Sequence, residues 1–468
     1  MANNTDKSRY FKELVTVVIG IAIALLPPPA GLEAKAMIFL GILAWAVMNW
    51  VITPMPTYAS GLIMLALFAL FKLVPFPRAF GAYSGGIVWL ILCVLLIGTA
   101  VSKSGLLSRV CLMIMKICPP TFRGQMLALL AGGCLIGPLM PSTTAKVAIA
   151  GPFATRIGEL LGLKERSRGL NGLYLAMQTG FCLMAPMFIT CSFWGYLLTG
   201  QLSAEEGALF TFIGWFKAML PWSVFTLVAS YISLVVLYRP SENVGMDRAS
   251  VQKMLDDLGP MKRDEKITIL VVLACLACWV LERQIGVAAV IPAVLAIGVL
   301  TFLKVLTPKD LNGTNWGLVL FVGQCSIISS IIAAVKLDTW LAAQLGPVIG
   351  NFASNPYLFI TAIAAAVMLV RLLIYGSSVI VLFMVLLTPV CHAAHVNPWV
   401  AGIISYVMMQ TWFMRYMNPP FLGAFEAAGG DAKLDYNGTL PYCFVFHAIA
   451  LIGLLVCVPF WKGMGILP

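Results

Sequence analysis

The sequence predicts an all-α polytopic membrane protein with about 11 transmembrane helices, in which two re-entrant hairpins belong to an inverted repeat. Three observations carry this prediction. Of the 468 residues, 60% are hydrophobic and only 10% are charged, which is too apolar for an ordinary soluble surface. Apolar runs of about 17 to 25 residues recur along the chain, each long enough to cross ~30 Å of hydrocarbon. Finally, the two halves of the chain carry matching interruptions.

Residues 1–34 hold the N-terminal segment and the first span, which three prolines follow without a cleavage site of small residues. We interpret this span as retained. If the chain starts in the cytoplasm and each span carries it to the other side of the membrane, the cytoplasmic connectors contain about 20 Lys and Arg residues and the outer connectors about 7. The bias predicts a multi-pass protein of the inner membrane, with its N-terminus in the cytoplasm and its C-terminus outside.

The chain divides into two halves of similar pattern. The first repeat is expected over residues 35–238 and the second over 267–468, with the polar stretch 239–266 as a cytoplasmic connector. In each half, a Trp-containing apolar helix ends in a shorter amphipathic piece, from Val88 in the first and from Asn315 in the second. An odd number of spans separates matching features, so the halves are expected to have opposite orientations.

Each half then contains an interrupted apolar segment, over about 122–161 and about 352–391. About 14 apolar residues flank a small polar break near Ser142 and near Ser377, and about 14 helical residues rise only ~21 Å, which is too short to cross. Each segment is therefore predicted as a hairpin that enters and leaves on one face, the first from inside and the second from outside. An irregular tip is tolerated at that depth only where it lines a cavity.

A span that is broken in its middle follows each hairpin, over about 169–199 and about 398–428, and a last span closes the chain. Gly195 is expected to weaken the first of these helices, whereas Pro419 and Pro420 cannot continue the second. Four breaks at corresponding places in two halves favour a functional site over isolated kinks.

Half-helices that end at such breaks expose unpaired N–H groups and a positive partial charge, which favour an anion. Hydroxyl, amide and cationic side chains at the same places are further donors for carboxylate oxygens. The candidate substrate-binding residues are Ser142, Thr143, Thr144, Lys146, Ser192, Ser377, Ser378, Arg415 and Asn418.

Three cations lie at membrane depth, where an ionisable group costs about 2.5 kcal/mol or more and usually faces a cavity. Lys146 is one turn beyond Ser142, and Arg415 lies just before Asn418, whereas the sequence leaves the depth of Arg371 open. No acidic residue is expected at comparable depth, so the site is predicted to be cationic when empty. For any one of these cations, the alternative to a role in the site is a structural one: the side chain binds backbone carbonyls or extends to the membrane–water interface.

Other functional classes find little support in the sequence. The 12 Cys are scattered and are interpreted as buried thiols, and nothing near His392 and His395 completes a metal site. The basic residues form no stripe with aromatics, which argues against nucleic acid. No nucleophile and base pair lies near the breaks, which argues against an enzyme.

At these residues the sequence resembles the divalent anion/sodium symporter family, which carries di- and tricarboxylates and in some members sulfate. The likeness covers nearly the whole chain, is strongest over residues 80–200, and looks closest to bacterial citrate and tartrate exchangers. The resemblance implies Ser-Asn-Thr at each hairpin tip. Here the tips are Ser-Thr-Thr from Ser142 and Ser-Ser-Val from Ser377, so both Asn are absent. It also implies a homodimer and a rigid-body, elevator-type motion of the hairpins.

The expected function is secondary transport of small di- or tricarboxylate anions by sodium-independent exchange, because a permanently cationic carrier crosses easily only when loaded. Lys146 and Arg415 would supply the charge that sodium supplies in the symporters. Three alternatives stay open: sodium symport, with a residual sodium site near Ser142, Thr143 and Cys191; transport of sulfate or sulfonate oxyanions; and an anion channel. The expected partners are the anion, the bilayer and a second copy of the chain. No cofactor is expected, and bound sodium belongs only to the symport alternative.

Overall fold

The computed structural model describes residues 2–468 apart from 141, 241–244, 246, 342, 345–354 and 373–375, and apart from the side chains of 2–7, 248 and 377. Within these residues, every named element is a helix, so the all-α prediction is confirmed. In the same part of the chain, six helices are long and apolar enough to cross a membrane, and five shorter apolar helices of 10–17 residues accompany them.

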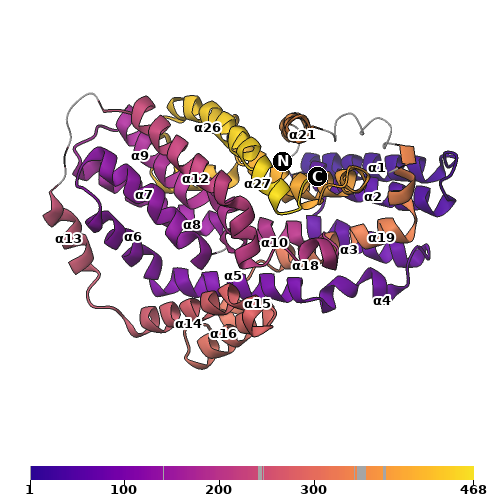
Figure 1. Ribbon diagram of the computed structural model, residues 1–468, viewed down its shortest axis with the longest axis horizontal. Coiled ribbons are helices and arrows are strands. Elements are labelled where there is room, and N and C mark those ends of the chain that lie inside the picture. The colour runs from indigo at the N-terminus through magenta and orange to yellow at the C-terminus, as the bar shows by residue number, and fades with distance from the viewer. Residues whose placement is uncertain are drawn as a thin grey trace.

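The helices before the first hairpin form one end of the molecule and part of a frame beside the hairpins (Figure 1). They are α1 (Ala2–Leu25), α2 (Ala34–Ile52), α3 (Thr57–Leu70), α4 (Phe76–Ala79), α5 (Gly86–Ser104) and α6 (Leu106–Ile117). Gly105 separates α5 from the amphipathic α6. A buried ion pair between Arg109 and Glu265, at 2.8 Å, then fixes α6 to the start of α14 (Arg263–Val280).

The first hairpin consists of α7 (Phe122–Ile136) and α8 (Thr143–Leu160), and the second of α21 (Pro356–Arg371) and α22 (Ser377–Ala393). The arms contain 15, 18, 16 and 17 residues. They are longer than the expected 14 because helical hydrogen bonding continues beyond the apolar run, as α8 does through Glu159. The three residues that precede Gly376 at the second tip lie outside the described residues.

The first broken span runs from α9 (Arg168–Gln178) through a π-helical turn and two short 3-10 turns to α10 (Phe193–Thr199). Gly195 lies inside α10, so the expectation that this glycine makes the break is wrong. The irregular segment lies before Gly195, where Gly180 packs on Gly133 of the first hairpin. The two backbones are so close that a Cβ added at Gly133 would lie 2.1 Å from the Gly180 carbonyl carbon. The close approach of the two backbones holds the break against the hairpin.

The second broken span consists of α23 (Trp399–Met408) and α24 (Pro419–Ala427). The helix ends at Met408, and Pro419 and Pro420 open the next helix rather than ending the first. This differs from the prediction because a proline is well tolerated in the first turn, where the helix has no use for its missing N–H.

Helices from the two halves of the chain pack against each other in a matched way. Helix α8 of the first hairpin packs against α24 of the second broken span, and α22 of the second hairpin packs against α10 of the first. Helices α12 (Phe212–Leu237) and α26 (Tyr436–Val456), which follow the broken spans, pack against each other. Hairpins and broken spans therefore form one packed body.

The remaining helices form the second part of the frame and the C-terminus. They are α11 (Ala204–Gly207), α13 (Arg248–Asp257), α15 (Glu282–Ile285), α16 (Val290–Phe302), α17 (Pro308–Asn312), α18 (Trp316–Ser326), α19 (Ile328–Ala334), α25 (Gly430–Lys433) and α27 (Val458–Gly463). Helices α14, α16 and α18 pack on α5. Ion pairs between connectors join residues that the charge count assigns to one side, such as Lys103 with Asp310.

Candidate functional site

The first hairpin tip is built around the start of α8. The Ser142 hydroxyl oxygen accepts a hydrogen bond from the Ala145 backbone N–H at 3.2 Å and so caps the helix. Thr143 beside it is buried, whereas the side chain of Thr144 is exposed. Because the Ser142 oxygen is the acceptor in the capping bond, its own O–H remains available to a ligand.

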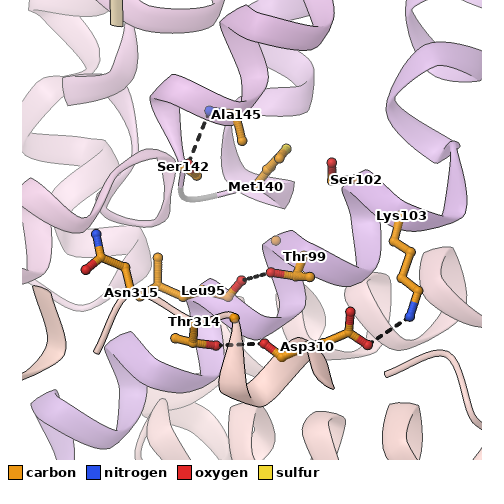
Figure 2. Close-up of a pocket in the computed structure, with 12 residues that line it drawn as sticks. Leu95, Thr99, Ser102, Lys103, Met140, Ser142, Ala145, Asp310, Thr314 and Asn315 are labelled. Atoms are coloured by element: carbon orange, nitrogen blue, oxygen red, sulfur yellow. Dashed lines mark hydrogen bonds and ion pairs between the residues drawn. The ribbon is translucent and has the colours of Figure 1, made fainter. Parts of the chain in front are cut away.

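A cavity of about 330 Å³ opens beside this tip, within the size range of small-molecule sites (Figure 2). The hairpin tip forms one wall, and α5 together with the segment from α17 to α18 forms the other. The residues that line it include Thr99, Ser102, Lys103, Ser142, Asp310 and Asn315. The cavity therefore lies between the hairpin body and the frame, with Ser142 on the hairpin side.

Lys146 is buried, with 1% of its surface exposed, and its Nζ donates a hydrogen bond to the Cys191 carbonyl oxygen at 2.9 Å. That carbonyl belongs to the break of the first broken span. The ammonium thus occupies an acceptor of the predicted sodium site near Ser142, Thr143 and Cys191. A sodium ion at this place would have to share the Cys191 carbonyl oxygen with the lysine.

Arg371 plays the corresponding part in the second half, and its side chain is also 1% exposed. Its guanidinium donates hydrogen bonds to the carbonyl oxygens of Met408 at 2.9 Å and Met417 at 3.1 Å. It also donates to both the hydroxyl, at 2.8 Å, and the carbonyl oxygen of Thr411. Met408 is the last residue of α23, and the other acceptors belong to the break between α23 and α24. Each hairpin therefore carries one buried cation that binds backbone carbonyls of a broken span.

Arg415 does not fit the sequence prediction. Its side chain is 45% exposed and makes two hydrogen bonds of 2.8 Å to the Asp431 carboxylate, so the expectation of a deep cation without an acidic neighbour is wrong. The reason is tertiary: α25 brings Asp431 back beside the break, and Tyr436 packs its ring 4.6 Å from the guanidinium carbon. Arg415 belongs to the connector side of the break.

Ser192 and Asn418 both cap the half-helices that follow the breaks. The Ser192 hydroxyl accepts from the Trp194 N–H at 3.3 Å. The Asn418 amide oxygen accepts from the Phe421 N–H at 2.9 Å, while its nitrogen donates to the Gln410 carbonyl. Both are buried. Since both ends of the Asn418 amide are bonded within the chain, this residue shapes the break.

The second tip is described only in part. Gly376 adopts φ +88°, a conformation that favours glycine, and starts α22. Ser378 follows in the first turn and is 6% exposed. The side chain of Ser377 lies outside the described residues.

Thr411 is a site residue that the sequence reasoning missed. Its hydroxyl and carbonyl both bind Arg371. A signal was present, because Met-Gln-Thr occurs at 177–179 and again at 409–411, at the end of the first half of each broken span. In the first copy, the hydroxyl of Thr179 bonds instead to the Leu175 carbonyl and to the Tyr442 hydroxyl.

Replacing Arg415 by Ala should leave the transport rate within about twofold of wild type, because an exposed ion pair contributes about 0–1 kcal/mol. Uptake of a radiolabelled anion into proteoliposomes measures this. Asp431→Asn, which removes the partner, should behave in the same way. A loss of transport beyond about tenfold in Arg415→Ala, with the protein still folded, would restore Arg415 to the site.

Comparison with known proteins gives a consistent set of relatives. The matching family is described as the sodium:sulfate symporter transmembrane region, and the match covers residues 7–464. The L-tartrate/succinate antiporter of Shigella dysenteriae is 21% identical over 399 residues, 79% of this chain and 80% of the antiporter. Inner membrane protein YbhI of Escherichia coli is 26% identical over 354 residues, covering 72% and 73%. Chloroplastic dicarboxylate transporter 1 of Spinacia oleracea is 25% identical over 347 residues; these cover 72% of this chain but only 61% of the transporter.

Proposed function

Because the chain belongs to the sodium:sulfate symporter family of membrane transporters, we propose that it is a sodium-independent exchanger of small di- or tricarboxylate anions. The chain is a transporter and not an enzyme. Two of the relatives are named for dicarboxylates or for tartrate and succinate, which supports a carboxylate substrate. Ser142, Thr143, Ser192 and Ser378 are the proposed substrate contacts at the tips and breaks.

The observation that carries the proposal is the pair of buried cations on the hairpins. Lys146 and Arg371 bind carbonyl oxygens at the two breaks, so the chain itself supplies a basic side chain to each break. Moving such charges through the membrane without a compensating anion is costly. A carrier of this kind changes state readily only when an anion is bound, which is the condition for obligatory exchange.

The proposed motion is an elevator-type displacement of the hairpin body against the frame, in a homodimer in the inner membrane, with the N-terminus in the cytoplasm. The contacts of α8 with α24 and of α22 with α10 support movement of the hairpins and broken spans as one body. The cavity at Ser142 lies at the boundary that such a motion would use. The resemblance to the divalent anion/sodium symporters supports the dimer.

Reconstitution into proteoliposomes tests the proposal directly. We expect uptake of radiolabelled malate, succinate or tartrate to require an internal dicarboxylate and to be unchanged when choline replaces sodium. Uptake that needs no internal anion and follows a sodium gradient would instead establish symport. Sulfate is the second candidate, because the family description names it, and it enters the same assay as a competitor. Transport that does not saturate would indicate a channel.

Replacing Ser142 by Ala should lower the exchange rate by at least about tenfold, although losing a helix cap costs only about 1 kcal/mol of stability. Thr121→Ala is the matched control, because the Thr121 hydroxyl caps α7 at the base of the same hairpin, accepting from the Gly124 N–H at 3.2 Å. Exchange and thermal stability are measured for both variants. Equal rates in the two would remove Ser142 from the substrate site.

A further inference from the structure

The frame wall of the cavity in Figure 2 is rich in hydrogen-bond donors. The Asn315 amide oxygen is used to cap α18, accepting from the Leu318 N–H at 3.1 Å, which leaves its NH₂ group for a ligand. Within the described residues, the Ser102 hydroxyl makes no hydrogen bond. Lys103 stands next to it at the end of α5. Together with Ser142 on the opposite wall, these donors suit an anion.

Lys103 is held by an ion pair across the mouth of the cavity. Its Nζ lies 2.8 Å from Asp310 Oδ2, and the two side chains are 47% and 15% exposed. Asp310 also accepts hydrogen bonds from the Thr307 backbone N–H and hydroxyl, each at 2.7 Å. If the Lys103 ammonium moves away, Asp310 therefore keeps two donors, and the half-exposed lysine side chain can pair with another anion.

The charge on Asp310 persists in this arrangement. Desolvation opposes ionisation of the carboxyl, but the hydrogen bonds from Lys103 and Thr307 outweigh it and hold the pKa of Asp310 below its ordinary value. The empty cavity mouth thus contains one positive and one negative charge. An incoming anion must compete with a fixed carboxylate for Lys103, and a dianion competes better than a monoanion because its attraction to the ammonium is stronger.

We propose that Lys103, with Ser102, Asn315 and Ser142, forms an access site that captures a small dicarboxylate at the mouth of the cavity, and that Asp310 is the anion it displaces. The inference rests on the proposed function and adds to it a residue that selects substrate on one face only. Lys103, near the end of α5, and Lys309, next to Asp310 in α17, are among the basic residues that the charge count assigns to the cytoplasmic side. The effects of changing Lys103 or Asp310 belong to that face.

Malate exchange in right-side-out and inside-out membrane vesicles tests this sidedness. Lys103→Gln should raise KM for malate about tenfold at the cytoplasmic face, with little change in kcat and none in KM at the outer face. Asp310→Asn should lower the cytoplasmic KM a few-fold and admit monocarboxylates such as lactate as competitors, because Lys103 no longer has a charged partner. Asn at 310 can still accept from Thr307, so the start of α17 is preserved.

The opposite signs of the two effects separate capture from structural support. If Lys103→Gln and Asp310→Asn both raise KM at both faces or both lower the melting temperature, the pair is a structural ion pair and the inference is overturned. Unchanged cytoplasmic KM in both variants overturns it as well. Lys116→Gln is the control, since Lys116 is an exposed lysine on α6 that does not line the cavity.

The proposed function fails in a different way. Failure of wild-type protein to exchange malate in either vesicle type would overturn the exchanger and the access site together. Exchange that survives in Lys103→Gln at unchanged KM, but is lost in Ser142→Ala, would remove only the access site.

Discussion

Replacing Lys146 by Met should reduce anion exchange to about a hundredth of the wild-type rate. The substitution removes a buried positive charge at the first break and leaves the Cys191 carbonyl without its donor, which costs about 1–3 kcal/mol for an unpaired buried group. A loss near the upper end of that range corresponds to about two orders of magnitude in rate. Counterflow of malate in proteoliposomes gives the rate.

Two companions sharpen this experiment. Lys116→Met removes a lysine from the exposed surface of α6 and should leave exchange unchanged. Lys146→Arg keeps the charge and a donor and should recover part of the rate, limited by the larger guanidinium in a buried place. Exchange at the wild-type rate in Lys146→Met would show that the first break needs no resident cation, and the exchange mechanism would lose its main support.

Replacing Arg371 by Met should have the largest effect on stability. The guanidinium binds carbonyl oxygens of Met408, Thr411 and Met417, and each buried carbonyl that loses its donor costs about 1–3 kcal/mol. In a protein of this length we expect the melting temperature to fall by about 5 °C, together with most of the exchange activity. Size-exclusion chromatography of heated, detergent-solubilised protein measures the first effect.

Arg371→Lys distinguishes charge from geometry at this position. A lysine keeps the positive charge but lacks the planar fork that reaches several carbonyls at once, so its stability should be intermediate. Arg415→Met is the matched control, because it removes an arginine from the same broken span at an exposed place. An Arg371→Met protein with wild-type melting temperature would contradict the role of this clamp in holding the second break.

Local properties of the sequence were sufficient to predict the helical membrane class, and the same properties predict the two hairpins and the two broken spans. Span length follows from hydrophobic runs, and a tip or a break follows from Gly, Pro and small polar residues in those runs, so each is readable from neighbouring residues. The position of a break was less certain. Pro419 can end one helix or start the next, and only the cap at Asn418 shows that it starts α24.

The partners of the cations could not be predicted in the same way. Lys146, Arg371 and Arg415 are all cations within apolar segments of the sequence, yet two of them bind carbonyls and the third pairs with an exposed Asp431. Backbone carbonyls carry no sequence signal of their own. Whether a carbonyl can accept a hydrogen bond from one of these cations depends on where a distant segment leaves the helical conformation and how closely it packs against the cation.

The sequence by itself therefore determined the all-helical membrane class, because this class depends on local hydrophobicity, and it predicts two matched halves from the residues that interrupt the helices. The tertiary structure decided which charges belong to the site. It joined Lys146 and Arg371 of the hairpins to carbonyl oxygens of the broken spans, because the segments at Cys191 and from Met408 to Met417 present these carbonyls to them. It left Arg415 exposed, because α25 carries Asp431 to that arginine.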